Sequence, residues 1–179
     1  MSDTHEVISS ENKFEGKWFS VRRETLIFPN GLKVERDVVD HPDAVVVIPV
    51  DQERNVLLVE QYRNAAGAML LELPAGTVEE GEDPLVSAQR ELREETGVAA
   101  RQLIPVGNFW ASPGFCTERM WMFLGLDLEN SPLEPDLDED ISVKRIPFEE
   151  VLEMAARGLI VDGKTIAGLF LAQNYLANR

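Results

Sequence analysis

The segment GTVEEGEDPLVSAQRELREETGV, residues 76–98, contains the best-marked helix of this sequence. Asp83 can cap the first turn, Pro84 suits the first helical position, and Gly97 stands where a left-handed residue commonly ends a helix. We therefore predict a helix over residues 84–96, preceded by a loop that is rich in acidic residues.

Two adjoining faces of this predicted helix differ in chemistry. At about 100° per residue, the packing stripe consists of Leu85, Ala88, Leu92 and Thr96. Beside it lies a carboxylate cluster made of Glu91, Glu94 and Glu95. Like charges this close together are unfavourable, so the pattern favours a compensating cation. Arg90 can neutralise one carboxylate, and Mg²⁺, a hard ion with oxygen ligands, could relieve the rest. The alternative is an acidic face that is only solvated.

Outward from this helix, the sequence predicts a mixture of strands and helices. Residues 14–28 and 32–39 flank the turn signal Pro29-Asn30-Gly31 and predict a hairpin. Buried-strand patterns at 44–50 and 56–62 predict a second hairpin, and a strand at 69–73 ends in a loop at Pro74-Ala75-Gly76. The elements after the helix are strands 103–110, 120–128 and 141–146, a loop at 129–140, and helices near 148–157 and 164–177.

Composition limits the classes of function. The 179 residues carry a formal net charge of −15, which would repel duplex nucleic acid. No run of apolar residues is long enough to span a membrane, and the single cysteine excludes an internal disulfide. The polar N-terminus does not look like a secretory signal, so we expect a cytoplasmic protein. Residues 1–13 are too polar to offset the entropy of ordering, and we expect a disordered tail there.

The spacing of the fixed positions points to a family. Gly76, Glu82 and the run Arg90–Val98 (RELREETGV) match the Nudix box at every defined position, so the chain resembles the Nudix hydrolases. This resemblance implies an α/β fold, an α/β/α sandwich with a mixed sheet, preceded by a small N-terminal antiparallel β subdomain. It places the subdomain at 14–40 and the Nudix domain at 41–179, and it implies cleavage of a nucleoside diphosphate linked to another moiety.

The resemblance also implies roles for the box residues. The metal ligands would be Glu91, Glu95 and the backbone carbonyl of Ala75, with Glu94 next in rank as a catalytic carboxylate. Arg90 and Glu82 would form an ion pair that fastens loop to helix, which we favour over direct catalysis by Arg90. Gly76 and Gly97 would serve backbone geometry.

Features outside the box resemble the branch of this family that hydrolyses ADP-ribose and nucleotide sugars. Pro113 lies in the stretch ASPGFCTE, which is similar to a marker of that branch, although it could be a simple turn. Arg63 would contact the substrate, since a guanidinium can grip a pyrophosphate through paired hydrogen bonds. The N-terminal hairpin implies a homodimer in which Trp18 stacks on adenine and Arg36 is a second substrate-side cation. The alternatives are a core tryptophan and a surface arginine. Glu118 would hold a ribose hydroxyl.

The general base would come from the acidic loop 129–140, where the resemblance puts Glu139 first. Asp138 and Asp140 are neighbouring alternatives, Glu118 is an outside candidate, and the loop could instead be merely solvated.

The expected function is hydrolysis of ADP-ribose to AMP and ribose 5-phosphate by a cytoplasmic homodimer that uses Mg²⁺ or Mn²⁺. One alternative is a pyrophosphatase for GDP-mannose or another sugar nucleotide, because stacking on Trp18 would accept any base. An alternative of another class is a non-catalytic sensor that binds ADP-ribose. An RNA-cap hydrolase would use the same box, but the acidic net charge disfavours it.

Overall fold

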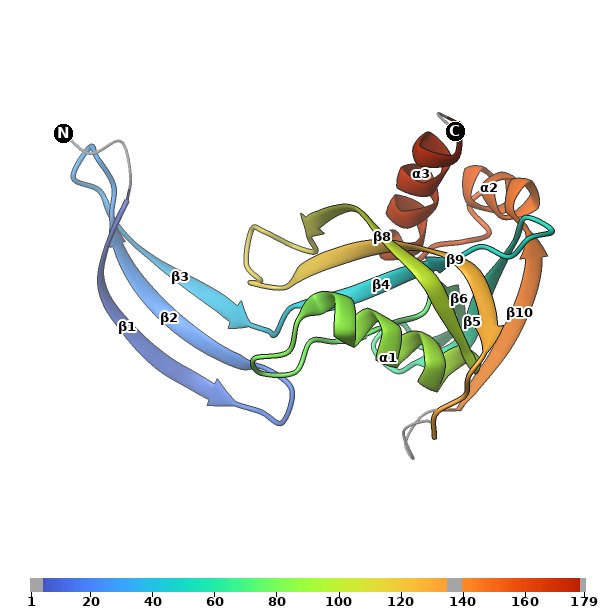
Figure 1. The fold of residues 1–179 in the computed structure, drawn as a ribbon. Helices are drawn as coiled ribbons and strands as arrows, with labels where there is room; N and C mark the ends of the chain where they lie inside the picture. Colours follow the sequence, from blue (N-terminus) through green and yellow to red (C-terminus); the bar gives the residue numbers. More distant parts are fainter. Residues whose placement is uncertain (1–4, 135–139, 178–179) are drawn as a thin grey trace. The chain divides into compact units, whose positions relative to one another are not determined.

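The computed structural model describes residues 5–134 and 140–177 (Figure 1). Contacts divide the chain into two compact units. The first unit is Met1–Asp43 with Phe109–Arg119, and the second is Ala44–Asn108 with Met120–Arg179. Within the described residues, no helix is both long enough and apolar enough to cross a membrane.

The first unit is built on an antiparallel sheet of β1 (Glu6–Glu15), β2 (Ser20–Ile27) and β3 (Lys33–Asp40), in that order. The predicted hairpin around residues 29–31 is confirmed, with Gly31 at a φ of 81° in the turn. Segment 109–119 joins this sheet through backbone bonds to Val39, whose N–H donates to Phe115 O at 2.7 Å.

β1 differs from the expectation of a polar tail. All ten of its residues are exposed, yet it pairs with β2 along its length, with two register irregularities. The expectation counted only side-chain burial, whereas the hydrogen-bonded ladder to β2 satisfies this backbone with little help from a core.

The second unit contains two sheets. One has the order β7-β4-β9-β8 and the other the order β10-β5-β6. Their strands are β4 (Ala44–Pro49), β5 (Asn55–Arg63), β6 (Ala68–Glu72), β7 (Ala75–Thr77), β8 (Val98–Trp110), β9 (Arg119–Asn130) and β10 (Ile141–Pro147), of which β8 and β9 extend into the first unit. β4 runs parallel to β9 and antiparallel to β7, so the expected mixed sheet is confirmed.

Within residues 5–134 and 140–177, the helices that accompany these sheets are α1 (Pro84–Thr96), α2 (Phe148–Ala156) and α3 (Gly163–Ala177). α1 has its predicted limits, because the Asp83 carboxylate accepts from Leu85 N at 2.8 Å and Gly97 adopts a left-handed φ of 73°. The packing stripe is narrower than predicted. Ala88 and Leu92 are fully buried, whereas Leu85 is 44% exposed near the start of the helix.

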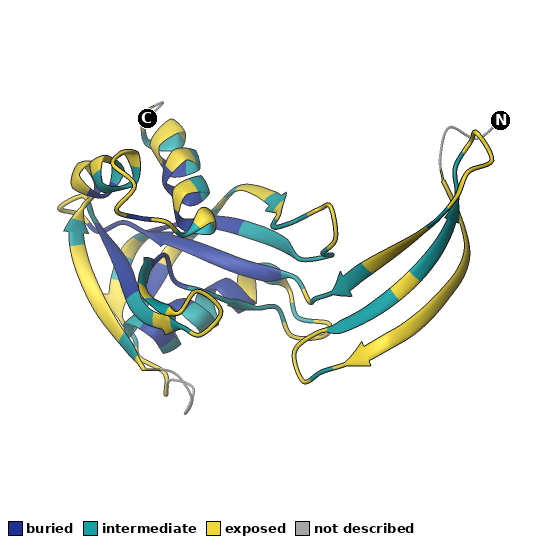
Figure 2. Cartoon of the chain, turned by 180° about the vertical axis from the view of Figure 1, so that it is seen from behind, coloured by how far each residue is buried: buried dark blue, intermediate teal, exposed yellow. Residues whose placement is uncertain are grey.

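Alternating side chains of the four-stranded sheet place a helix on each face. Val45, Val47 and Phe123 form a core cluster with Ala88 and Leu92 of α1. Their neighbours along the strands, Ile48 and Met122, lie instead close to Gly168 of α3. Because successive side chains of a strand point to opposite faces, α1 and α3 enclose the sheet (Figures 1 and 2). The predicted α/β/α sandwich is therefore confirmed.

The second predicted hairpin is wrong in its pairing. Strands β4 and β5 exist, but they belong to different sheets, and Val50, the residue after β4, forms an isolated bridge with Val56. Both strands are largely buried runs, and burial alone does not specify a strand's partner.

The loop predicted at Pro74-Ala75-Gly76 is also only partly right. Pro74 separates β6 from β7, but Ala75 and Gly76 pair with Val46 and Val45 of β4. Proline removes only its own N–H, so the ladder can resume at the next residue. This short strand carries the first residues of the predicted box.

Candidate active site

Arg90 of α1 is the cation that lies among the box carboxylates. Its Nη1 donates to Glu91 Oε1 at 2.7 Å and to Glu94 Oε2 at 3.0 Å, so one nitrogen bridges two glutamates. Its Nη2 donates to Glu82 Oε2 at 3.1 Å, which forms the ion pair expected between loop and helix. Arg90 therefore contacts three carboxylates, not the single one that the sequence suggested.

These contacts fix the charge of the cluster. Partial burial lowers the pKa of Arg90, but hydrogen bonds and charges from Glu82 and Glu91 outweigh it and raise the pKa overall. The hydrogen bond from Arg90 lowers the pKa of Glu82, which Ser87 Oγ reinforces by donating to Glu82 Oε2 at 2.6 Å. The loop before α1 is thus held to the helix by ionised groups.

The lack of a side chain at Gly76 makes room for the Glu91 carboxylate. A Cβ atom on Gly76 would lie 2.1 Å from Glu91 Cδ and 2.2 and 2.3 Å from its two oxygens. Real side chains do not approach so closely, so only glycine lets this carboxylate rest against β7. The close approach explains the glycine at the start of the box.

Glu95 is held against the preceding residue of β7. Its Oε2 accepts a hydrogen bond from Ala75 N at 3.0 Å, and the residue is only 6% exposed. Ala75, Glu91 and Glu95, the three predicted metal ligands, therefore belong to one junction between β7 and α1.

Arg63, which the prediction places on the substrate, binds a carboxylate of its own chain. Its Nε and Nη2 donate to the two oxygens of Glu72 at 2.8 and 2.7 Å. Glu72 is 1% exposed and also accepts from Lys164 of α3. Sequence analysis missed this pair, because alternation along a strand puts Glu72 on the face opposite Leu71 and Leu73, which does not indicate a buried charge.

Four predicted substrate residues lie in the first unit, whereas Arg63 and the box lie in the second. Trp18 is 59% exposed with Lys17 Nζ 4.2 Å from its ring centre, so it is no core tryptophan.

The other predicted substrate residues of this unit also have contacts of their own. The Arg36 guanidinium donates to Glu35 O on β3. Glu118 has His41 Nδ1 at 3.6 Å from its carboxylate, and Pro113 lines a hollow of about 240 Å³.

Comparison with known proteins gives the family. A model of the NUDIX domain matches residues 40–168. The chain belongs to the Nudix family. An ADP-ribose pyrophosphatase of Bacillus subtilis (strain 168) is 36% identical over 160 residues, with 88% of this chain and 86% of that protein covered. A GDP-mannose pyrophosphatase of Yersinia pestis (strain Pestoides F) is 33% identical over 171 residues, with 87% and 85% covered.

A solved structure of an ADP compounds hydrolase has a TM-score of 0.88 at 22% sequence identity, with 97% of this chain and 95% of that chain covered. At this identity the likeness concerns the fold, and it agrees with the Nudix sandwich described above.

Nudix hydrolases generally use a divalent metal ion. The oxygen donors at the junction of β7 and α1 fit such an ion, because hard divalent ions prefer carboxylate and carbonyl oxygens. In the described part of the chain, no three acidic, histidine or cysteine side chains form a ready metal site. The predicted metal ligands are instead two carboxylates, of Glu91 and Glu95, and the backbone carbonyl of Ala75. Beside them, Arg90 bridges the carboxylates of Glu91 and Glu94.

The predicted general base lies outside the described residues. Glu139 and its neighbour Asp138 both belong to the segment 135–139, whereas the alternative Asp140 is described, as an exposed residue before β10.

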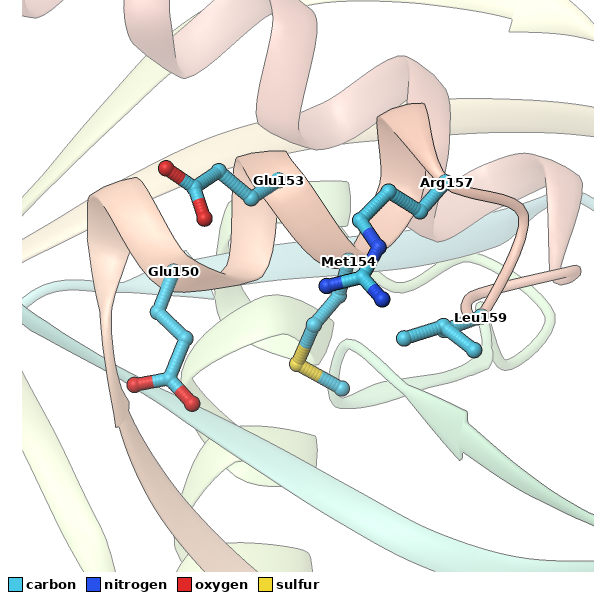
Figure 3. Close-up of a pocket in the computed structure, with 5 residues that line it drawn as sticks. All are labelled: Glu150, Glu153, Met154, Arg157 and Leu159. Carbon is cyan, nitrogen blue, oxygen red and sulfur yellow. The ribbon is translucent and has the colours of Figure 1, made fainter.

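A hollow of about 600 Å³ in the described part of the chain is lined by none of the predicted site residues. It is lined by residues of α2 and of the turn that follows it (Figure 3). These residues are Glu150, Glu153, Met154, Arg157 and Leu159. The Nudix box contributes none of them, so volume alone does not identify the chemistry.

Gly76→Ala should displace the Glu91 carboxylate while leaving the fold largely intact, since the colliding atoms are the far end of a flexible side chain. We expect at least a tenfold weaker Mn²⁺ affinity by calorimetry, on the order of the 10–100-fold losses seen when ligand support is removed. Gly163→Ala is the matched control, because an added Cβ meets nothing within 4 Å there. Equal Mn²⁺ affinity in both variants would contradict the assignment of Glu91.

Glu72→Gln should change the pH dependence of stability. Burial raises the pKa of Glu72, but its bonds to Arg63 and Lys164 lower it overall below the ordinary 4.5. The ionised carboxylate therefore stabilises the fold above about pH 4.5, and this contribution is lost as pH falls through the folded-state value. Urea unfolding should find the variant less stable at pH 7, with the gap to wild type narrowing below about pH 4.5. Exposed Glu150→Gln is the control, and a gap independent of pH would refute this view.

Proposed function

We propose that this chain hydrolyses the pyrophosphate bond of a nucleoside diphosphate sugar, with ADP-ribose the preferred substrate and AMP and ribose 5-phosphate the products. The observation that carries the proposal is the placement of Glu91 and Glu95 against β7, beside Arg90. Relatives named ADP-ribose pyrophosphatase, similar along most of the chain, support the choice of substrate.

The chemistry needs positive charge, because the phosphoryl oxygens of a pyrophosphate repel a nucleophile. Glu91, Glu95 and the Ala75 carbonyl would hold Mg²⁺, or Mn²⁺ in its place. Such an ion screens those oxygens and lowers the pKa of a bound water. Arg90 Nη1 holds the carboxylates of Glu91 and Glu94 in place by donating a hydrogen bond to each. Glu139 would take the proton from the attacking water, with Asp138, Asp140 and Glu118 as alternatives.

Substrate recognition would involve residues beyond the Nudix box. The guanidinium of Arg63 has five N–H donors, so it can bind Glu72 and a pyrophosphate oxygen together. Trp18 is exposed and available to stack on a base. Arg36, Pro113 and Glu118 are the other substrate-binding residues that we propose. We further propose that the enzyme acts as a homodimer, paired through its N-terminal sheet, in the cytoplasm.

A second candidate within this class is hydrolysis of GDP-mannose. It is favoured by the similarity to GDP-mannose pyrophosphatases and by the exposed Trp18, whose ring would accept either purine. A non-catalytic sensor for ADP-ribose is the candidate of another class. It is disfavoured because every defined position of the box is occupied by the residue that the chemistry needs.

The substrate assignment can be tested with the purified protein and Mg²⁺. With ADP-ribose, GDP-mannose and UDP-glucose compared at equal concentrations, we expect the highest kcat/KM with ADP-ribose. Glu91→Gln should abolish turnover without altering the circular dichroism spectrum, because it removes a ligand while relieving charge crowding. Equal rates with all three substrates, or none with ADP-ribose, would defeat the choice. An active Glu91→Gln variant would defeat the mechanism, and binding without turnover by wild type would favour the sensor.

Glu139→Gln should lower kcat far more than it raises KM, since a general base acts on the water and not on the bound nucleotide. A loss of about 10²–10⁴-fold in kcat is the range for removing such a group. Asp140→Asn, one residue further along, is the matched control and should retain most activity. If Asp140→Asn carries the loss and Glu139→Gln does not, the base is Asp140.

A further inference from the structure

Thr165, near the start of α3, is fully buried and has its hydroxyl between two partners. The hydroxyl accepts a hydrogen bond from Leu73 N at 2.8 Å and donates to Asp162 Oδ2 at 2.6 Å. The same carboxylate oxygen accepts from Thr165 N at 2.9 Å. Asp162 thus fixes both the backbone and the hydroxyl of Thr165, which leaves the hydroxyl lone pair directed at Leu73.

The Leu73 N–H is the first of a series of backbone contacts that lead to the box. The carbonyl of the next residue, Pro74, accepts from Val47 N of β4 at 2.9 Å. Ala75 N then donates to Glu95 Oε2 at 3.0 Å, and Gly76 rests against the Glu91 carboxylate. The segment that crosses from β6 to β7 is therefore fixed by contacts at successive residues. The first of these contacts is the hydrogen bond from Leu73 N to the Thr165 hydroxyl.

We propose that Thr165, oriented by Asp162, is a positioning residue for the metal site at the junction of β7 and α1. Through Leu73 it sets where the Ala75 carbonyl and its neighbour Glu95 lie. The inference rests on the proposed function, because that proposal makes Ala75 and Glu95 ligands. It extends the site to α3, on the opposite face of the sheet from α1.

The physical reason is the burial of both partners. Leu73 is fully buried, so water cannot accept a hydrogen bond from its N–H if the Thr165 hydroxyl is removed. The backbone would then shift to find another acceptor, and the shift would pass through Pro74 to Ala75. Metal ligation tolerates little displacement of its donors, which is why groups that support ligands affect affinity.

Thr165→Val and Thr165→Ser separate the hydroxyl from the volume of the side chain. Valine preserves shape without the hydroxyl, and serine preserves the hydroxyl with one methyl fewer. Mn²⁺ binding is measured by calorimetry without nucleotide, and kcat, KM and the Mg²⁺ concentration for half-maximal rate are measured with ADP-ribose. We expect valine to weaken Mn²⁺ binding about tenfold and to raise the Mg²⁺ concentration for half-maximal rate in parallel. The KM for ADP-ribose, measured at saturating Mg²⁺, should stay nearly unchanged. Serine should stay within about twofold of wild type, since it keeps the bond.

A purely structural role would lower stability without changing metal affinity. Leu169→Ala, a buried change elsewhere in α3, supplies that comparison and should lower the urea midpoint while Mn²⁺ affinity stays at the wild-type value. Thr165→Ala gives the same comparison if the valine variant is not recovered folded. Wild-type Mn²⁺ affinity in the variant that lacks the hydroxyl would overturn the proposal, as would an equal loss in Leu169→Ala.

The binding measurement also separates this inference from the proposed function. If wild type binds Mn²⁺ but hydrolyses none of the nucleoside diphosphate sugars, the function fails while the Thr165 comparison still stands. If wild type binds no Mn²⁺, the metal site is wrong and the inference is overturned with it.

Discussion

Holding several carboxylates within one turn of a helix is the constraint on which this site depends. Three glutamates of α1 would repel one another in isolation. Arg90 offsets that repulsion with a nitrogen shared between Glu91 and Glu94, and it extends to Glu82 in the preceding loop. The arginine therefore holds the carboxylates of Glu82, Glu91 and Glu94 together through hydrogen bonds.

The sheet supplies the second half of this arrangement. Because side chains alternate along β4 and β9, one face of the sheet receives α1 and the other receives α3. The segment from Glu72 to Gly76 lies where both helices reach it, with Thr165 and Lys164 bonded from α3 and Glu95 from α1. A single short stretch of backbone thus couples the two faces of the sandwich.

The sequence predicted what depends on neighbours along the chain and missed what depends on distant ones. The cap at Asp83, the end at Gly97 and the carboxylate face of α1 follow from local rules, and all three are present. The bond between Glu72 and Lys164 joins residues 92 positions apart, so no local pattern reveals that the Glu72 carboxylate is bound by cations from two different elements. The same holds for strand partners, since a buried run such as β4 can pair with any other.

The return of segment 109–119 to the N-terminal sheet bears on how the protein is made. His41 and Thr117 bond to each other across 76 positions, and Val39 pairs with Cys116 beside them. A chain that leaves the ribosome from its N-terminus exposes β3 long before this partner segment has been synthesised. During that interval the sheet has two open edges, β1 and β3, and the exposed polar side chains of β1 make at least its own edge a poor template for aggregation.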